Sequence, residues 1–168
     1  MTRAEVEMLL DWHAWASERL LAAASGVGPG RFAANGPGSI PSPRDALVRL
    51  ANHDATWLAR WRGAPASFAL FPGAMRGTQA LAGRWTPIRE ETRAVLLALP
   101  AEAFGEPWEY RTRSGRTIRT TRALSVLHFV TRAAYLRAVA VTALREAGAR
   151  GVHVDLAAYL EARQRERP

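Results

Sequence analysis

The stretch LSVLHFVTRAAYLRAVAVTALREAG, residues 124–148, decides the fold, because it has the length and spacing of one long helix. Side chains at three- and four-residue steps share one face of an α-helix. One such stripe consists of Leu124, His128, Thr131, Arg132, Tyr135 and Val139. Apolar residues also cover the adjoining face, which is typical of a helix at the centre of a bundle. We expect the stripe to face inward, and its polar members are candidate functional residues because burying bare polar groups is costly.

Start and stop signals predict three further helices. Thr2 and Glu5 form a capping box ahead of a helix that reaches about residue 24. Ser42 as N-cap, followed by Pro43, begins a second helix that reaches about residue 62. A third helix ends near residue 99. It begins either at Thr86 and Pro87 or earlier, near residue 79, with a kink at Pro87.

Two short strands are predicted between the third and the fourth helix. Residues 107–121 read as WEYRTR, a turn at Ser114 and Gly115, and RTIRTT. The tail at residues 152–160 carries apolar side chains that we expect to dock on the helices. The sequence therefore predicts a single all-α domain over residues 1–168, a helical bundle with a small β-hairpin between helices 3 and 4.

The composition of the chain indicates which types of site and which cellular location to expect. The chain contains no cysteine, which excludes disulfides, thiolate nucleophiles and cysteine-based zinc sites. No run of about 18 apolar residues is present, so we expect no membrane partner. The N-terminus leads directly into an amphipathic pattern, unlike a signal peptide. The expected location is cytoplasmic.

The net charge of +8 makes nucleic-acid binding one hypothesis. The densest basic cluster lies on the hairpin and consists of Arg111, Arg113, Arg116, Arg119 and Arg122. However, all 23 basic residues are arginine, whereas lysine also binds phosphate well. The cluster also has no interleaved aromatic residues on which bases could stack. A solvated strand edge explains it equally well, and a nucleic-acid partner is not the favoured interpretation.

Several stretches together resemble the DinB/YfiT-like superfamily, named for a DNA-damage-inducible bacterial protein. WHAWASERLL at residues 12–21 is similar to the family's aromatic-x-x-W-A-N-x-R-L-L opening. GSIPSPRDALVRLANHDATWLARWRG at residues 38–63 is similar to its second helix, which ends in W-L-x-R-W. The hairpin, the long helix and VDLAAYL at residues 154–160 match later family elements in the same order.

The resemblance implies an up-down-down-up four-helix bundle, often a homodimer, with a role in the stress or DNA-damage response. Many members hold a divalent metal with one histidine on the second helix and two on the fourth. Characterised relatives include metal-dependent thiol S-transferases. Three imidazoles with an open fourth position suit a Lewis-acid metal such as zinc or nickel.

This sequence departs from the family at all three metal ligands. Aligned on Trp57, the ligand of the second helix falls at Arg49, and those of the fourth helix fall at Arg132 and Leu136. A guanidinium group has no lone pair to donate, so it cannot bind a cation. We therefore expect no catalytic residue, no metal at the family positions and no cofactor.

Two alternative sites follow from the polar residues. His53 and His128 each lie one helical turn from a lost ligand, and with His13 on the first helix they could form a displaced metal site. The plainer interpretation is that they are core histidines. Arg49 and Arg132, with Tyr135 beside them, could form an interior pocket for a small anionic ligand. Alternatively, they pair with Asp11, Glu18 or Asp54 and close the cavity.

The favoured hypothesis is a non-catalytic binding or stress-response protein that has lost the family metal site. The first alternative is a metal-dependent thiol S-transferase or hydrolase-like enzyme that uses the displaced histidines. The second is a basic nucleic-acid-binding protein.

Overall fold

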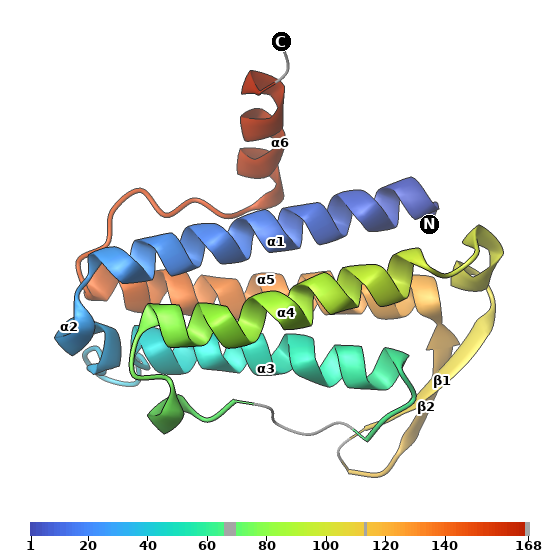
Figure 1. Ribbon diagram of the computed structural model, residues 1–168, viewed down its shortest axis with the longest axis horizontal. Coiled ribbons are helices and arrows are strands. Elements are labelled where there is room, and N and C mark those ends of the chain that lie inside the picture. Colours follow the sequence, from blue (N-terminus) through green and yellow to red (C-terminus); the bar gives the residue numbers. More distant parts are fainter. Residues whose placement is uncertain (66–69, 113, 167–168) are drawn as a thin grey trace.

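The computed structural model describes residues 1–65, 70–112 and 114–166, and these are mostly helical (Figure 1). The elements in chain order are α1 (Arg3–Gly26), α2 (Pro29–Ala33), α3 (Pro43–Trp61), η1 (Pro72–Ala74), α4 (Thr78–Leu97), η2 (Ala101–Phe104), β1 (Pro107–Arg111), β2 (Thr117–Thr121), α5 (Arg122–Glu146) and α6 (Leu156–Arg165). Residues 26–40, between the first two predicted helices, contain the short helix α2.

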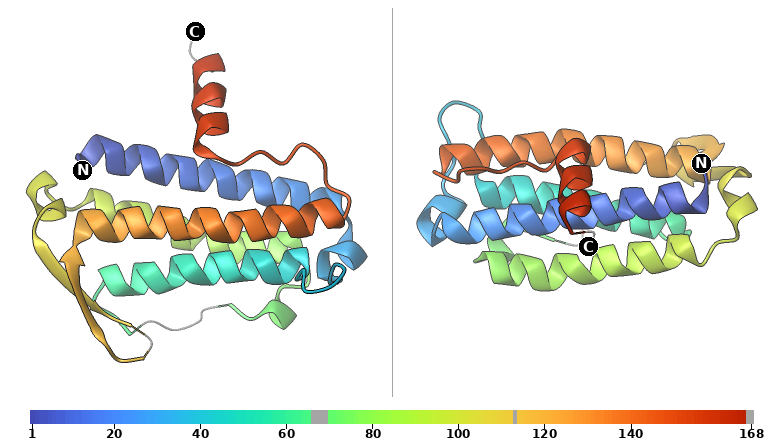
Figure 2. Two further views of the ribbon diagram at one scale, coloured as in Figure 1. Left: turned by 180° about the vertical axis from the view of Figure 1, so that it is seen from behind. Right: turned by 90° about the horizontal axis from the view of Figure 1, so that it is seen from above.

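The long helices α1, α3, α4 and α5 pack lengthwise along one another (Figure 2). Both α1 and α3 pack against α4 and also against α5. The antiparallel strands β1 and β2 form a small hairpin between α4 and α5 at one end of the molecule, as predicted. Gly115 has φ +79° in its turn, a conformation that glycine adopts without a steric penalty.

The helix-capping signals predicted from the sequence are present in the structure. The Thr2 hydroxyl accepts a hydrogen bond from the backbone N–H of Glu5, and the Glu5 carboxylate accepts one from the backbone N–H of Thr2, so the predicted capping box is present. The Ser42 side chain caps α3. Of the two starts predicted for the third long helix the earlier is correct, because α4 begins at Thr78 and contains Pro87.

The core lies between the four long helices. Trp57 and Trp85 are its largest fully buried side chains, 2% and 0% exposed. Large aromatic side chains contribute most to core burial because each removes a large area from water. Trp85 belongs to α4, and its indole also takes part in the polar network described below.

The inward stripe predicted for the long helix is wrong. Leu124 and Tyr135 are 56% and 60% exposed, and His128 and Arg132 are also exposed. The buried face of α5 is the opposite one. Its members are Ser125, Val126, Phe129, Val130, Ala133, Leu136, Arg137, Ala140, Ala143 and Leu144. A helix that is apolar around most of its girth has two faces of similar hydrophobicity, so periodicity alone does not choose between them.

The tail docks only in part. Val152 and Val154 are buried, and the Trp12 indole donates to the carbonyl of Val154 at 3.0 Å. Helix α6 projects away from the packed helices (Figures 1 and 2). Tyr159, its buried residue, packs against Trp15 with ring centroids 5.6 Å apart.

Among the described residues, one helix is long and apolar enough to cross a membrane by length and composition alone, and that helix is α5. The core helix of a soluble protein passes the same test. Within the structure α5 packs along α1 and α3.

Candidate functional site

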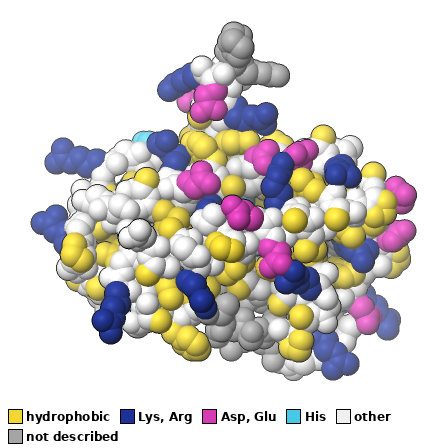
Figure 3. Space-filling model, in the orientation of Figure 1, with side chains coloured by type: hydrophobic (Ala, Val, Ile, Leu, Met, Phe, Trp, Pro, Cys, Tyr) yellow, Lys and Arg dark blue, Asp and Glu magenta, His cyan; other side chains and the backbone are white. Residues whose placement is uncertain are grey.

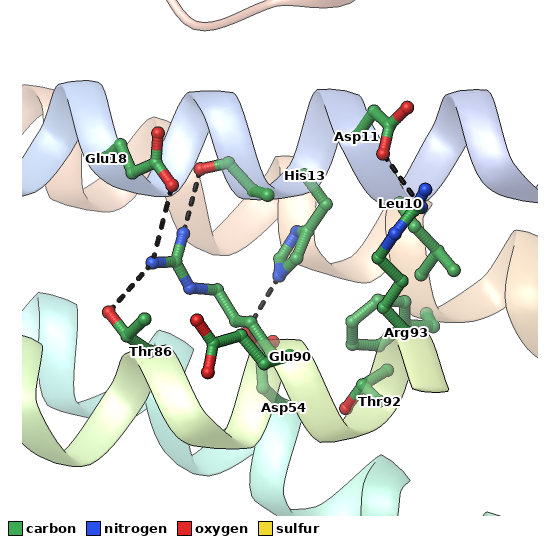
Figure 4. A pocket seen from close by; sticks show the side chains of 12 residues that line it. Leu10, Asp11, His13, Glu18, Asp54, Thr86, Glu90, Thr92 and Arg93 are labelled. Atoms are coloured by element: carbon green, nitrogen blue, oxygen red, sulfur yellow. Dashed lines mark hydrogen bonds and ion pairs between the residues drawn. The ribbon is translucent and has the colours of Figure 1, made fainter. Parts of the chain in front are cut away.

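A cavity of about 100 Å³ lies between α1 and α4 (Figure 4). Asp54 of α3 and Phe129 of α5 complete its wall. The lining residues from the two long helices are Leu10, Asp11, His13, Ala14 and Glu18 of α1 and Thr86, Arg89, Glu90, Thr92 and Arg93 of α4. The cavity lining therefore combines apolar and charged side chains.

Asp54 is the central polar group of this site and is completely buried. Its Oδ2 accepts a hydrogen bond from the Trp85 indole at 2.6 Å and lies 2.8 Å from Nε2 of His13. His13 is 3% exposed. Three helices thus contribute one residue each to a hydrogen-bonded cluster at the edge of the cavity.

Arg137 of α5 determines the tautomer of His13. Its Nη1 lies 2.9 Å from Nδ1 of His13, and a guanidinium group can only donate hydrogen bonds. Nδ1 must therefore accept, so the imidazole proton lies on Nε2 and is donated to Asp54. Arg137 also stacks over the Trp12 ring at 4.3 Å from its centroid. The buried charges of Arg137 and Asp54 are thus linked through a neutral imidazole.

The pKa values of Asp54 and Arg137, at the two ends of this network, agree with both groups being charged. Burial alone would raise the pKa of Asp54, but the hydrogen bonds that it accepts from His13 and Trp85 help to hold it below its usual value. Burial lowers the pKa of Arg137 to about 10, against the attraction of Asp54. Arg137 therefore still carries its charge at neutral pH.

Two arginines of α4 close the cavity against α1. Arg89 is buried and donates to the Ala14 carbonyl at 2.8 Å and to Thr86 Oγ1 at 3.1 Å, and it lies 3.9 Å from the Glu18 carboxylate. Arg93 binds Asp11 at 2.8 Å and Glu7 at 2.5 Å. Burial lowers the pKa of Arg89. Both guanidinium groups thus already have acidic neighbours.

Some buried charged atoms at the site have no hydrogen-bond partner within the described part of the chain. They are Asp54 Oδ1 and Arg89 Nε, both from residues that line the cavity, and Arg137 Nη2 behind His13. A buried polar atom without a partner costs about 1–3 kcal/mol, and more when it is charged. Water or a ligand in the cavity would reduce that cost.

The three predicted histidines do not converge on one point. His13 and His53 both pack against Phe129, with ring centroids 4.8 and 5.2 Å away, and the His53 ring is stacked on it. Nε2 of His53 donates to the Phe129 carbonyl at 3.0 Å. His128 is exposed and packs against Trp57. Residues 1–65, 70–112 and 114–166 contain no group of three or more His, Asp or Glu residues arranged to hold a metal.

The interior pocket predicted from Arg49, Arg132 and Tyr135 is not formed by these residues, because all three are exposed. Arg132 stacks over the Tyr135 ring at 4.7 Å, on the outer side of α5. Leu136, the third lost ligand position, is buried. The prediction failed because it took the wrong face of α5 as inward. The acids proposed as their counterions instead contact other residues: Asp11 binds Arg93, Glu18 lies near Arg89, and Asp54 binds His13.

Sequence reasoning found His13 and Asp54 but missed Trp85, Arg89 and Arg137. The sequence did contain a signal for Trp85 and Arg89. These two residues recur at helical spacing with Thr92 and Leu96, and all four are buried. Reading that stripe would have placed an arginine on the inward face of α4. Arg137 lies on a helix with two equivalent apolar faces and carried no such signal.

Comparison with known proteins finds no family model that matches this sequence, and no curated protein matches it. The resemblance to the DinB/YfiT-like superfamily therefore stays a prediction that depends on the motifs quoted above.

His13 and Asp54 are not arranged as a catalytic pair that faces the cavity. In a catalytic histidine–carboxylate pair, one imidazole nitrogen is held by the carboxylate and the other faces the substrate. Here the second nitrogen of His13 is covered by Arg137. The imidazole therefore has no free nitrogen with which to abstract a proton from a substrate in the cavity.

Proposed function

We propose that this chain is a divergent, non-catalytic member of the DinB/YfiT-like superfamily that binds a small molecule in the cavity between α1 and α4. The proposal includes the up-down-down-up order of a four-helix bundle. In Figure 1, α1 and α5 run in one direction and α3 and α4 in the other, which supports that order. A cytoplasmic stress-response role and a homodimer belong to the same proposal and depend on the resemblance.

The observation that supports the binding role is the buried Asp54 carboxylate in the lining of the cavity. Asp54 is 0% exposed, it lines a space of about 100 Å³, and its Oδ1 has no partner among the described residues. Arg137 balances the charge of Asp54 through His13, but the second carboxylate oxygen still lacks a donor. A bound molecule that donates a hydrogen bond to this oxygen would complete the hydrogen bonding of the carboxylate.

A cavity-filling variant tests the proposal. Ala14 lines the cavity on α1, so Ala14→Leu should fill part of it without removing a member of the polar network. Ala22→Leu makes the same change at an exposed position of the same helix. We expect a panel of small amines, amides and carboxylic acids to contain a compound that raises the melting temperature of the wild-type protein and of Ala22→Leu, but not of Ala14→Leu. Binding that is equal in both variants, or no binding at all, would contradict the proposal.

A further inference from the structure

We infer that Asn35 is a site of spontaneous chemical modification, at which the side-chain amide is converted to an acid. The inference does not depend on the proposed binding role. Asn35 is exposed, is followed directly by Gly36, and lies in the segment between α2 and α3, outside both helices. Because glycine has no side chain, it lets the backbone nitrogen that follows an asparagine come close to the asparagine side chain.

The reaction needs only water as a co-reactant. The backbone nitrogen of Gly36 loses its proton to the solvent and attacks Cγ of Asn35. A bond forms between this nitrogen and Cγ, the bond from Cγ to Nδ2 breaks, and Nδ2 leaves as ammonia. Water then opens the resulting five-membered imide at one of its two carbonyl groups. The products are an aspartyl residue and an isoaspartyl residue, in which the main chain runs through the side-chain carbon.

Both members of the reactive pair have structural roles in this segment. Ser42, the N-cap of α3, is completely buried, and its backbone N–H donates to Oδ1 of Asn35 at 3.0 Å. A buried backbone N–H needs such an acceptor. A Cβ at Gly36 would come within 3.0 Å of Cβ and Cγ2 of Ile40, so a larger residue there would displace the Ile40 side chain. The packing of this segment therefore favours an Asn-Gly pair in spite of its reactivity.

The same segment restrains the reaction in the folded chain. The N–H of Gly36 donates to the Ile40 carbonyl at 3.1 Å, and Oδ1 of Asn35 is held by Ser42. The attack requires a Gly36 nitrogen without its proton and an Asn35 side chain that is free to turn toward it. Both hydrogen bonds must therefore open first, and the rate should follow the population of the locally opened state.

The other asparagine of the chain, Asn52, lacks these features. It lies within α3, is 7% exposed and is followed by His53. Its side chain donates to the Leu70 carbonyl at 2.7 Å and accepts from the Leu70 N–H at 3.0 Å. The modification should therefore be confined to Asn35.

Incubation of the full chain at physiological temperature in mildly alkaline buffer tests the inference, with a parallel sample unfolded in urea. Peptide mapping by mass spectrometry locates the new acid, and chromatography separates the aspartyl and isoaspartyl products. We expect conversion at Asn35 alone in the folded chain. It should be about tenfold slower than in the unfolded chain, the equivalent of roughly 1.4 kcal/mol for opening the segment.

Variants separate the chemistry from the restraint. Asn35→Ser retains an oxygen that can accept a hydrogen bond but has no amide, and it should stay unmodified. Pro37→Ala should accelerate the reaction in the folded chain only, because the proline ring stiffens the turn in which the Pro37 carbonyl accepts from the Ile40 N–H. Pro100→Ala makes the same change at another exposed proline and should have no effect.

Three outcomes would overturn the inference. The first is a folded chain that is still intact at Asn35 when the unfolded chain has been fully converted. The second is conversion of Asn52 before Asn35. The third is equal rates in the folded and the unfolded chain, which would show that the hydrogen bonds of Asn35 and Gly36 do not restrain the reaction.

Discussion

Arg137 is the residue on which the buried polar network depends. It is 2% exposed, donates to His13 and stacks on Trp12, and its charge is balanced by Asp54 through the imidazole. A buried ion pair adds little net stability over an apolar replacement of both partners, but the loss of one partner leaves an uncompensated buried charge. The cost of a single substitution is therefore much larger than the net contribution of the pair.

Replacing Arg137 by methionine should lower the free energy of unfolding by about 3–5 kcal/mol, because Asp54 would stay buried without its counterion. The matched control is Arg145→Met, an exposed arginine on the same helix, which should change it by about 0.5 kcal/mol or less. Urea denaturation followed by circular dichroism measures both. Equal stability of the two variants would show that the network contributes nothing.

His53 makes stability depend on pH. Burial lowers its pKa to about 4, against the attraction of Asp54 and the hydrogen bond to the Phe129 carbonyl. The unfolded chain therefore takes up this proton near pH 6.5, and the folded chain only near pH 4. Stability should fall as the pH drops through that window, by up to about 3 kcal/mol. The depressed pKa of Asp54 acts in the same direction but at lower pH.

In the His53→Gln variant, the free energy of unfolding should lose most of its dependence on pH between pH 6.5 and pH 4. His153→Gln changes an exposed histidine and should retain it. Denaturant unfolding at half-unit pH steps distinguishes the two, and an unchanged slope in His53→Gln would assign the pH dependence to other groups.

At the scale of single elements, α4 is the helix whose local sequence opposes its structure. Pro87 lies inside it, at the tenth of 20 residues. Proline lacks the N–H that would bond the carbonyl four residues earlier, and its ring crowds that carbonyl, which here belongs to Gly83. Burial of Trp85, Arg89, Thr92 and Leu96 on the same helix offsets this local penalty. Tertiary packing therefore maintains a helix that propensity alone would divide at Pro87.

Replacing Pro87 by alanine should raise the free energy of unfolding by about 1–3 kcal/mol, because it restores a helical hydrogen bond at an exposed position. The gain is partly reduced by the greater freedom of the unfolded chain. Arg84→Ala, also exposed on α4, should have nearly no effect, since arginine and alanine have similar helix propensities. A loss of stability in Pro87→Ala would mean that the proline conformation is itself required.

At the scale of the whole molecule, basic and acidic side chains are interspersed over the face that Figure 3 presents. On the hairpin, Arg119 lies 3.6 Å from Glu109, and beside it Arg122, the first residue of α5, lies 4.0 Å from Glu106. Arg113, also in the predicted basic cluster, lies outside the described residues. Paired and interspersed charges give little support to the nucleic-acid-binding alternative.

The outer face of α5 provides a test of the proposed homodimer. Leu124, Leu127 and Tyr135 are 56%, 43% and 60% exposed along one helix. Exposed apolar side chains that share a helix face can form an interaction surface. We expect light scattering to give twice the 18.4 kDa chain mass for the wild type and for Leu160→Glu, a control on α6. The Leu127→Glu variant should give a monomer, and a monomeric wild type would refute the dimer.

The sequence by itself determined the local features of this protein. The capping box at Thr2, the cap at Ser42 and the hairpin turn at Gly115 all lie where they were predicted. Each of these signals acts between residues that are at most about four positions apart, so the chain needs no distant partner to form them. The mostly helical character follows from the same signals.

Only the tertiary structure decided which face of α5 is buried and which polar residues meet. His13 and Asp54 are 41 positions apart, and His13 and Arg137 are 124 apart. A helix with apolar residues around most of its girth can be rotated with little change in its own hydrophobic burial. Its orientation is therefore determined by close packing against α1 and α3 and by the need to pair the Arg137 charge with Asp54.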